Sequence, residues 1–141
     1  MVWRPRNETA EDLQREEAAA KTLSEVWNVE VVKLSDALYG VDWAFGRDNK
    51  VVAFGEFKAR SKKYDTLLLS FAKYTKLHNL HKVTALPVLL IVQWPDGLWY
   101  WNMTDDPPKS ISLGGNSRGQ NGDIEPVVYI NVSEFTQVSN D

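Results

Sequence analysis

The chain has 141 residues, a net charge of −3 and no cysteine. A chain of this length fits one domain with a single hydrophobic core, so we expect residues 1–141 to form one domain. The lack of cysteine excludes disulfides, thiolate metal ligands and cysteine nucleophiles. No apolar stretch approaches the roughly 20 residues that cross a bilayer, and the N-terminal residues show no apolar signal region. We therefore expect a cytoplasmic protein with no membrane partner.

The first predicted helix begins after the N-cap Thr9, with Asp12 at position N3. Residues 46–50 supply turn chemistry that pairs the second and third strands as a hairpin. The predicted elements, in chain order, are a helix at 9–27, strands at 29–34, 41–45 and 51–58, a helix at 65–82, strands at 87–94 and 98–103, a long loop at 104–126 and a strand at 127–132. This order predicts an α/β protein with a mixed central sheet flanked by helices, whose core spans 9–103.

Basic side chains are concentrated in one segment of an otherwise acidic chain. Residues 58–82 carry seven Lys and Arg residues against a single Asp. Such a segment can attract a polyanion to one face of the protein. The alternative is a solvated helix and loop without a partner.

The sequence Glu56-Phe57-Lys58 ends the third predicted strand. Side chains alternate along a strand, so Glu56 and Lys58 share one face and Phe57 points to the other. Asp42 lies in the partner strand of the hairpin, between apolar residues that make a carboxylate costly to bury. Two carboxylates and an ammonium group near one another form an oxygen-rich pocket suited to Mg²⁺ or Mn²⁺.

The first helix offers one more acid. Glu16 lies in the middle of the apolar face of this helix and Glu17 lies toward its edge, so either could be the helix acid that contributes to the site. A carboxylate on an apolar face needs a partner, which a metal site would provide. The alternative is an ion pair with a Lys or Arg from the sheet. The apolar face is defined by Leu13, Ala20, Leu23 and Trp27.

The element order, Asp42 and Glu56-Phe57-Lys58 together resemble the PD-(D/E)XK nuclease superfamily. The core of that superfamily is a helix, three strands, a second helix and a further strand (αβββαβ), which residues 9–94 match. Val41 stands where the superfamily usually has Pro. Residues 118–128 look like the tail of small phage-encoded proteins of this type.

The resemblance implies a restriction-endonuclease-like fold and a Mg²⁺- or Mn²⁺-dependent nuclease that hydrolyses phosphodiester bonds in DNA, with structure-specific or end-directed cleavage. Asp42, Glu56 and the backbone carbonyl of Phe57 would hold the metal, and Glu16 would tune it. Lys58 would activate the attacking water. The protein would act in the cytoplasm of a prokaryote or of a phage-infected bacterium.

The resemblance and the basic segment also suggest contacts to nucleic acid, from Arg60, Lys62, Lys63, Lys73, Gln93 and Arg118. Many relatives act as dimers, so a homodimer is one candidate assembly. Two other functions stay open. The chain could be a catalytically silent nuclease fold that binds nucleic acid or a host protein, or Asp42, Glu56 and Lys58 could form only a structural salt-bridge cluster.

Overall fold

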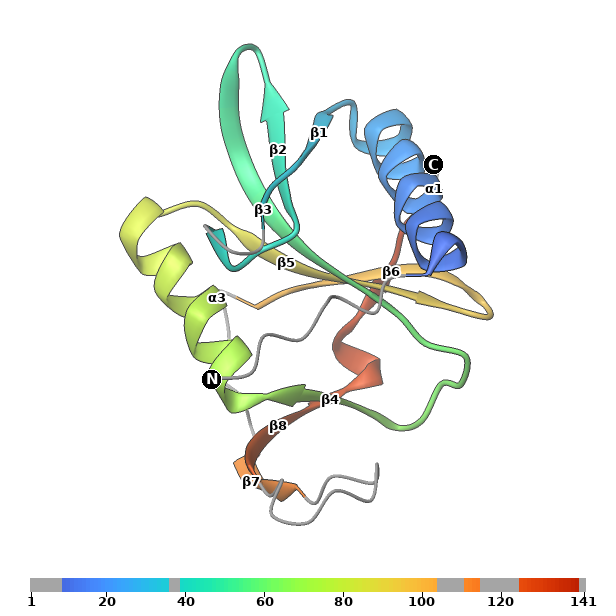
Figure 1. Ribbon diagram of the computed structural model, residues 1–141, viewed down its shortest axis with the longest axis vertical. Helices are drawn as coiled ribbons and strands as arrows, with labels where there is room; N and C mark the ends of the chain where they lie inside the picture. The colour runs from blue at the N-terminus through green and yellow to red at the C-terminus, as the bar shows by residue number, and fades with distance from the viewer. Residues whose placement is uncertain (1–8, 36–38, 104–110, 115–124, 140–141) are drawn as a thin grey trace.

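The computed structural model describes residues 9–35, 39–103, 111–114 and 125–139. A six-stranded sheet runs through the centre, in the order β1-β2-β3-β5-β6-β9. Helix α1 covers one face of this sheet, and helix α3 covers the other together with a small sheet in the order β4-β8-β7 (Figure 1). Within the described part of the chain, no helix is both long and apolar enough to span a membrane.

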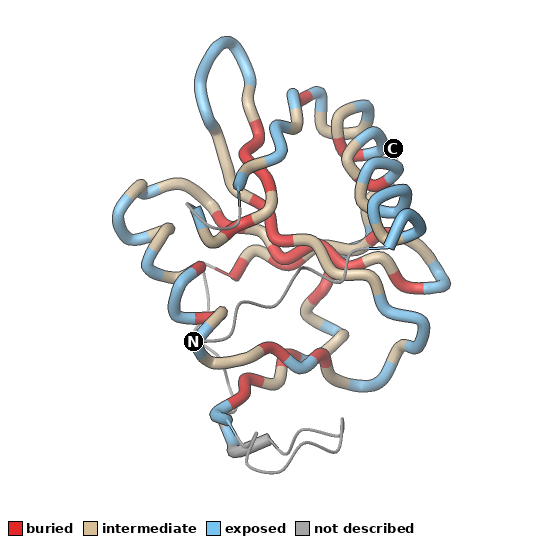
Figure 2. Tube along the Cα trace, viewed as in Figure 1, coloured by how far each residue is buried: buried red, intermediate tan, exposed pale blue. Residues whose placement is uncertain are grey.

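Helix α1 (Ala10–Trp27) begins as predicted. The Thr9 side chain accepts the Asp12 amide N–H, and the Asp12 carboxylate accepts the Thr9 N–H, which forms a capping box. The buried residues of this helix are Ala19 and Leu23, whereas Leu13 is exposed. The predicted apolar face is therefore wrong at Leu13, since only the later turns of α1 place residues such as Leu23 in the core and the first turns are mostly exposed (Figure 2).

Strands β1 (Glu30–Lys33), β2 (Trp43–Arg47) and β3 (Lys50–Ala59) are antiparallel neighbours. Asp48 and Asn49 both have positive φ, as a two-residue hairpin turn requires. The β2–β3 pairing then shifts by one residue, since Gly46 pairs with Val51 but Phe45 pairs with Ala53. The extra residue in β3 is a β-bulge.

Strand β5 (Val88–Trp94) pairs with β3 in parallel and with β6 (Gly97–Asn102) in antiparallel orientation. The central sheet is therefore mixed, as predicted. Its last strand is β9 (Thr136–Gln137), which the sequence prediction missed because only two residues pair there. A single 3₁₀ turn, at Val132–Glu134, precedes β9.

The prediction of a helix over 65–82 is wrong at its start. Residues Thr66–Ser70 form strand β4, and helix α3 (Phe71–Thr84) begins after Ser70, whose side chain accepts the Lys73 N–H. Leu67 and Leu69 are buried while Leu68 is exposed, which is the two-residue alternation of a strand. Three consecutive leucines satisfy either periodicity, and pairing with β8 decides between them. Helix α3 buries Tyr74 and Leu77.

The predicted loop at 104–126 contains a strand. Strand β7 (Ile111–Gly114) pairs with β8 (Glu125–Asn131), which itself begins two residues earlier than predicted. The surrounding Gly, Pro, Asn and Asp residues conceal this four-residue strand in the sequence. The remaining loop positions, 104–110 and 115–124, lie outside the described residues, and so does Arg118.

Two apolar clusters lie on opposite faces of the central sheet. Ile91 of β5 packs with Leu23 of α1, whereas Leu90 and Val92 pack with α3 and the small sheet. The cluster between the central and small sheets includes Leu69 and Val128. Strand β4 is therefore part of the core that supports β3 and β5.

The alternation in β4 can be tested with two leucines. Leu69→Ala removes a side chain that is only 1% exposed, so we expect a loss of about 2–5 kcal/mol in the free energy of unfolding. Leu68→Ala is the matched control and should cost less than about 1 kcal/mol, since Leu68 is 47% exposed. Chemical denaturation measures both. The reverse order would show that residues 66–70 are helical.

Candidate active site

The bulge in the β2–β3 hairpin brings two acids together. Beyond it, Trp43 pairs with Gly55, so the next residues along, Asp42 and Glu56, lie opposite each other. Directly opposed residues of an antiparallel pair point to the same face of the sheet. Without the bulge, Asp42 would face Gly55 and the Glu56 side chain would point to the other face. Asp42 lies just before β2 begins, one residue outside the strand in which it was predicted.

Neighbouring residues fix the backbone on both sides of Glu56. The Phe57 amide N–H donates to Asp42 Oδ2 at 2.8 Å, which connects Asp42 to strand β3. On the other side, Gly55 lies against the ring of Phe45, and a Cβ atom at residue 55 would be 2.7 Å from that ring. Only glycine allows this close approach, so Gly55 is needed for the packing that precedes Glu56.

Glu56 is the only charged residue fully buried within the described part of the chain. Its Oε2 lies 2.6 Å from Lys73 Nζ, and Lys73 also donates to the Gly40 carbonyl at 2.8 Å. Burial, the hydrogen bond to Asp42 and the negative charge of Asp42 together raise the pKa of Glu56 from 4.5 to about 8, although Lys73 acts in the opposite direction. At neutral pH and without a cation, the Glu56 carboxyl group is therefore mostly protonated.

Lys58 lies on the same face of β3 as Glu56, two residues further along. Burial lowers the pKa of its ammonium group, and the positive charge of Arg60 lowers it further, while Glu56 and Asp42 oppose this shift. A lysine with a lowered pKa can accept or donate a proton more readily than a solvated one. Asp42, Glu56 and Lys58 are thus brought together as the sequence predicted.

Glu16 of α1 reaches the same region. Its Oε2 lies 3.3 Å from Lys33 Nζ of β1, which is the ion pair to the sheet considered as an alternative. Its Oε1 is buried and has no hydrogen-bond partner. Since an unpaired buried carboxylate oxygen is costly, this atom can accept a further ligand. Glu17 is exposed, so Glu16 is the helix acid that faces the site.

Asp42, Lys58 and Glu16 line a pocket of about 300 Å³, here called the acidic pocket, and Glu56 is buried beside Asp42. Its cations are Lys58 and Arg60, and its remaining lining residues are Asp12, Glu16, Asp42, Phe57 and Ala59. No three Asp, Glu or His side chains within the described ranges enclose a cation by themselves. Mg²⁺, however, is commonly held by one or two carboxylates together with substrate phosphate oxygens and water. The pair of Asp42 and Glu56 therefore fits a divalent cation whose other ligands come from the substrate and water.

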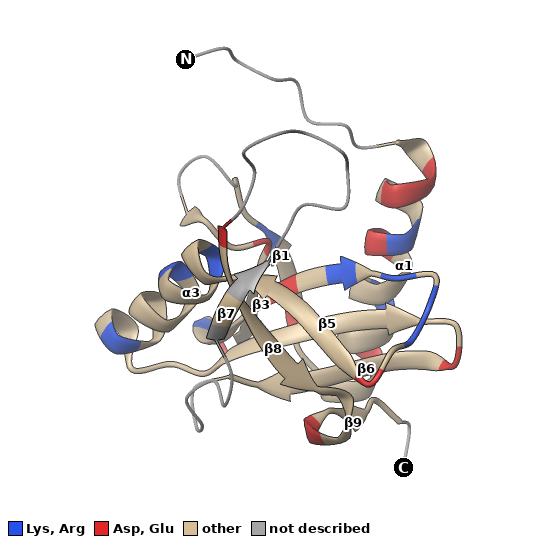
Figure 3. Cartoon of the chain, turned by 90° about the horizontal axis from the view of Figure 1, so that it is seen from below, with Lys and Arg blue, Asp and Glu red and all other residues tan. Residues whose placement is uncertain are grey.

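The predicted nucleic-acid contacts fall in different places. Arg60 lines the acidic pocket, and Lys62 is exposed in the basic segment that follows β3 beside α1 (Figure 3). Lys63 instead pairs with Asp96 at 2.7 Å. Gln93 donates to the Trp94 carbonyl at the end of β5. Lys73 points to Glu56, so it belongs to the buried site instead of an outer surface.

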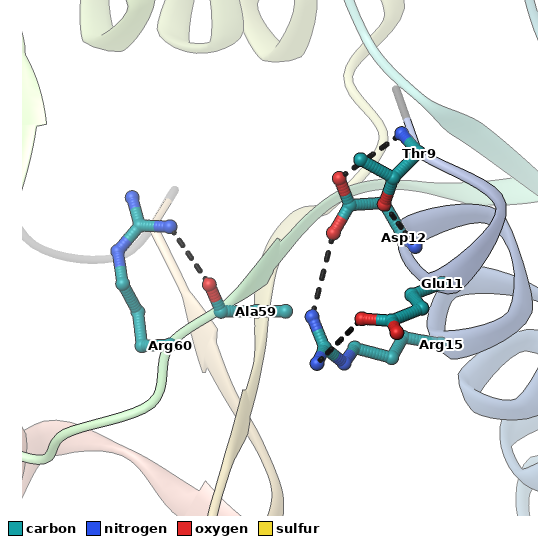
Figure 4. Close-up of polar contacts among 6 residues, drawn as sticks. All are labelled: Thr9, Glu11, Asp12, Arg15, Ala59 and Arg60. Atoms are coloured by element: carbon teal, nitrogen blue, oxygen red, sulfur yellow. Dashed lines mark hydrogen bonds and ion pairs between the residues drawn. The ribbon is translucent and has the colours of Figure 1, made fainter. Parts of the chain in front are cut away.

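Sequence reasoning missed two residues that line the site region, Asp12 and Arg15. Asp12 was assigned only to the helix cap, although its spacing of four residues from Glu16 places both on one helix face. Arg15 pairs with Asp12 and with Glu11 (Figure 4). The link between Lys73 and Glu56 was also missed, because it depends on how α3 packs against β3.

Comparisons with known proteins identify the family and the fold. Over residues 2–138 the sequence matches the family described as "Phage putative PDDEXK endonuclease". The fold is similar to that of Hjc, a Holliday junction resolvase from the archaeal hyperthermophile Archaeoglobus fulgidus, with a TM-score of 0.55 and 12% identity over 84% of this chain and 94% of that one. No curated protein matches the sequence. The fold is restriction-endonuclease-like, as predicted, and the chain belongs to this PD-(D/E)XK family of phage endonucleases.

Proposed function

We propose that this protein is a divalent-metal-dependent nuclease that hydrolyses phosphodiester bonds in DNA. The observation that carries the proposal is that Asp42 interacts with the buried Glu56 and lines a small pocket together with Lys58. Membership of the endonuclease family supports the reaction class. The likeness in fold to a Holliday junction resolvase makes branched DNA the first substrate to test. A homodimer stays a prediction.

Asp42 and Glu56 would hold the cation through their carboxylate oxygens, with the carbonyl of Phe57 and, through its free oxygen, Glu16. A bound Mg²⁺ would supply stabilisation for the negative charge that develops on the phosphate in the transition state. Glu56 must lose its proton before it can act as a ligand. Lys73 then holds the Glu56 carboxylate in place through its 2.6 Å contact.

Lys58 would orient the attacking water and assist its deprotonation. Its ammonium group is buried beside Arg60, which lowers its pKa, and it lines the same pocket as Asp42. A group within hydrogen-bond reach of the water and with a pKa moved toward neutrality is suited to this task. After bond cleavage the same side chain can stabilise the charge on the leaving oxygen.

Replacing Lys58 should lower the rate of DNA cleavage without lowering the stability of the fold. We expect the purified protein to cleave DNA with Mg²⁺ or Mn²⁺ and to lose cleavage in EDTA. Lys58→Ala should lower kcat by at least about 100-fold, with an unchanged unfolding temperature. Lys50→Ala is the matched control, since Lys50 lies exposed at the other end of β3. Gel assays on four-way junction, flap, duplex and single-stranded DNA measure the cleavage.

The alternative functions give different outcomes in that assay. If neither the parent nor Lys58→Ala cleaves DNA but both bind it equally well, the protein is a non-catalytic nuclease fold. If neither protein binds or cleaves DNA, the polar cluster serves the structure alone. Cleavage that persists in Lys58→Ala at the level of Lys50→Ala would contradict the role given to Lys58.

Metal binding should depend on pH through Glu56. Below about pH 8 a proton occupies this carboxyl group and competes with the cation, so the rise in unfolding temperature caused by Mn²⁺ should grow as the pH increases from about 6 to 8.5. Asp42→Asn should abolish the rise, whereas Asp48→Asn, at the exposed hairpin turn, should leave it intact. Scanning fluorimetry measures it. A rise that is constant over this pH range would contradict the assignment of Glu56 as a ligand.

A further inference from the structure

A second hollow, of about 490 Å³, lies beside the acidic pocket. We call it the arginine hollow, after Arg15 of α1 and Arg60 of the segment that follows β3, and it is also lined by Ser61 and Gln93. Ala59 and Arg60 line both hollows, so the two are contiguous. Figure 4 shows the side chains of Arg15 and Arg60 on either side of Ala59.

The two hollows differ in charge. The acidic pocket is lined by three carboxyl groups and two cations, which suits a metal ion and its ligands. The arginine hollow is lined by two arginines and, among the residues that the structure describes there, by no Asp or Glu. An anion next to the acidic pocket is therefore attracted to the arginine hollow, where no lining carboxylate opposes it.

The contacts that position Arg15 leave some of its N–H donors available. Its guanidinium nitrogens lie 3.4 Å from Asp12 Oδ1 and 3.9 Å from Glu11 Oε2, and its side chain is 55% exposed. Exposed ion pairs of this kind contribute little, because solvent screens them. A guanidinium group has five N–H donors and matches a phosphate in geometry. The pairs with α1 acids thus orient Arg15 and leave donors for a ligand.

Arg60 and Ser61 are held in place from the other side. Their segment is fixed to the β5–β6 turn by Lys63, whose Nζ lies 2.7 Å from Asp96 Oδ2 and 3.6 Å from the centre of the Trp99 ring. The Arg60 N–H also donates to the Gln93 carbonyl at 2.9 Å. The arginine hollow therefore exists before any ligand binds, which lowers the entropic cost of binding.

We propose that the arginine hollow binds the phosphate group next to the scissile one on the same nucleic-acid strand, with Arg15 and Arg60 as its cationic contacts. The inference rests on the proposed nuclease function and adds to it the path of the substrate strand over the protein surface. That strand passes from the acidic pocket, over Ala59, toward the end of β5. Arg15, which lies on α1 outside the basic segment, becomes a substrate-binding residue.

Charge removal on α1 tests the inference. We expect Arg15→Gln to raise Kd and KM for a 20-nucleotide duplex by about tenfold. The rise in KM should far exceed the fall in kcat. The slope of log Kd against log salt concentration should decrease in magnitude by the amount that corresponds to about one lost phosphate contact. Arg15→Lys should restore that slope, since it keeps the charge. Lys21→Gln is the matched control, because it removes an exposed charge from the same helix away from both hollows.

Binding is measured in EDTA, so that it does not depend on cleavage, and kinetics are measured with Mg²⁺. If the parent binds and cleaves DNA while Arg15→Gln matches Lys21→Gln in Kd and salt dependence, the inference is overturned and the proposed function stands. A fall in affinity with an unchanged salt dependence also overturns it, since that pattern indicates a structural role. A parent that neither binds nor cleaves DNA overturns both.

Discussion

The arrangement of the site depends on one extra residue in the β2–β3 hairpin. The turn at Asp48-Asn49 would by itself set a pairing that places Asp42 opposite Gly55. Because side chains alternate between faces, a shift by one residue decides whether Asp42 and Glu56 share a face or lie on opposite faces. The bulge supplies that shift, and β-bulges are frequent beside active sites, where they redirect side chains.

Burying two neighbouring acids destabilises the folded protein, and the surrounding residues reduce this effect without removing it. Burial and the neighbouring Asp42 raise the pKa of Glu56 to about 8, and Lys73 offsets part of this effect. The fold supports the arrangement through apolar packing on both faces of β3 and β5. A polar cluster kept at such a cost is typical of a functional site, because an apolar replacement would be more stable. The arginine hollow extends the same surface with the opposite charge.

The sequence was sufficient for much of the fold and for the proximity of Asp42, Glu56 and Lys58. Alternation placed Glu56 and Lys58 on one face, and the capping residues Thr9 and Asp12 placed the start of α1. It was insufficient where tertiary pairing decides between local alternatives, as in the leucine run of β4, which only its pairing with β8 makes a strand. It also could not show the bulge, the contact of Lys73 with Glu56 or the neighbourhood of Arg15 and Arg60, since these depend on three-dimensional packing.

We expect the carboxyl groups of Asp42 and Glu56 to bind one divalent cation jointly. The most direct measurement is a crystal structure of the protein grown with Mn²⁺ at a pH above 8, with anomalous diffraction data that locate the metal. We expect one strong anomalous peak between these two carboxylates, on the side that faces the pocket lined by Lys58 and Glu16. A map with no peak there, while Lys73 still pairs with Glu56 as it does without metal, would contradict it.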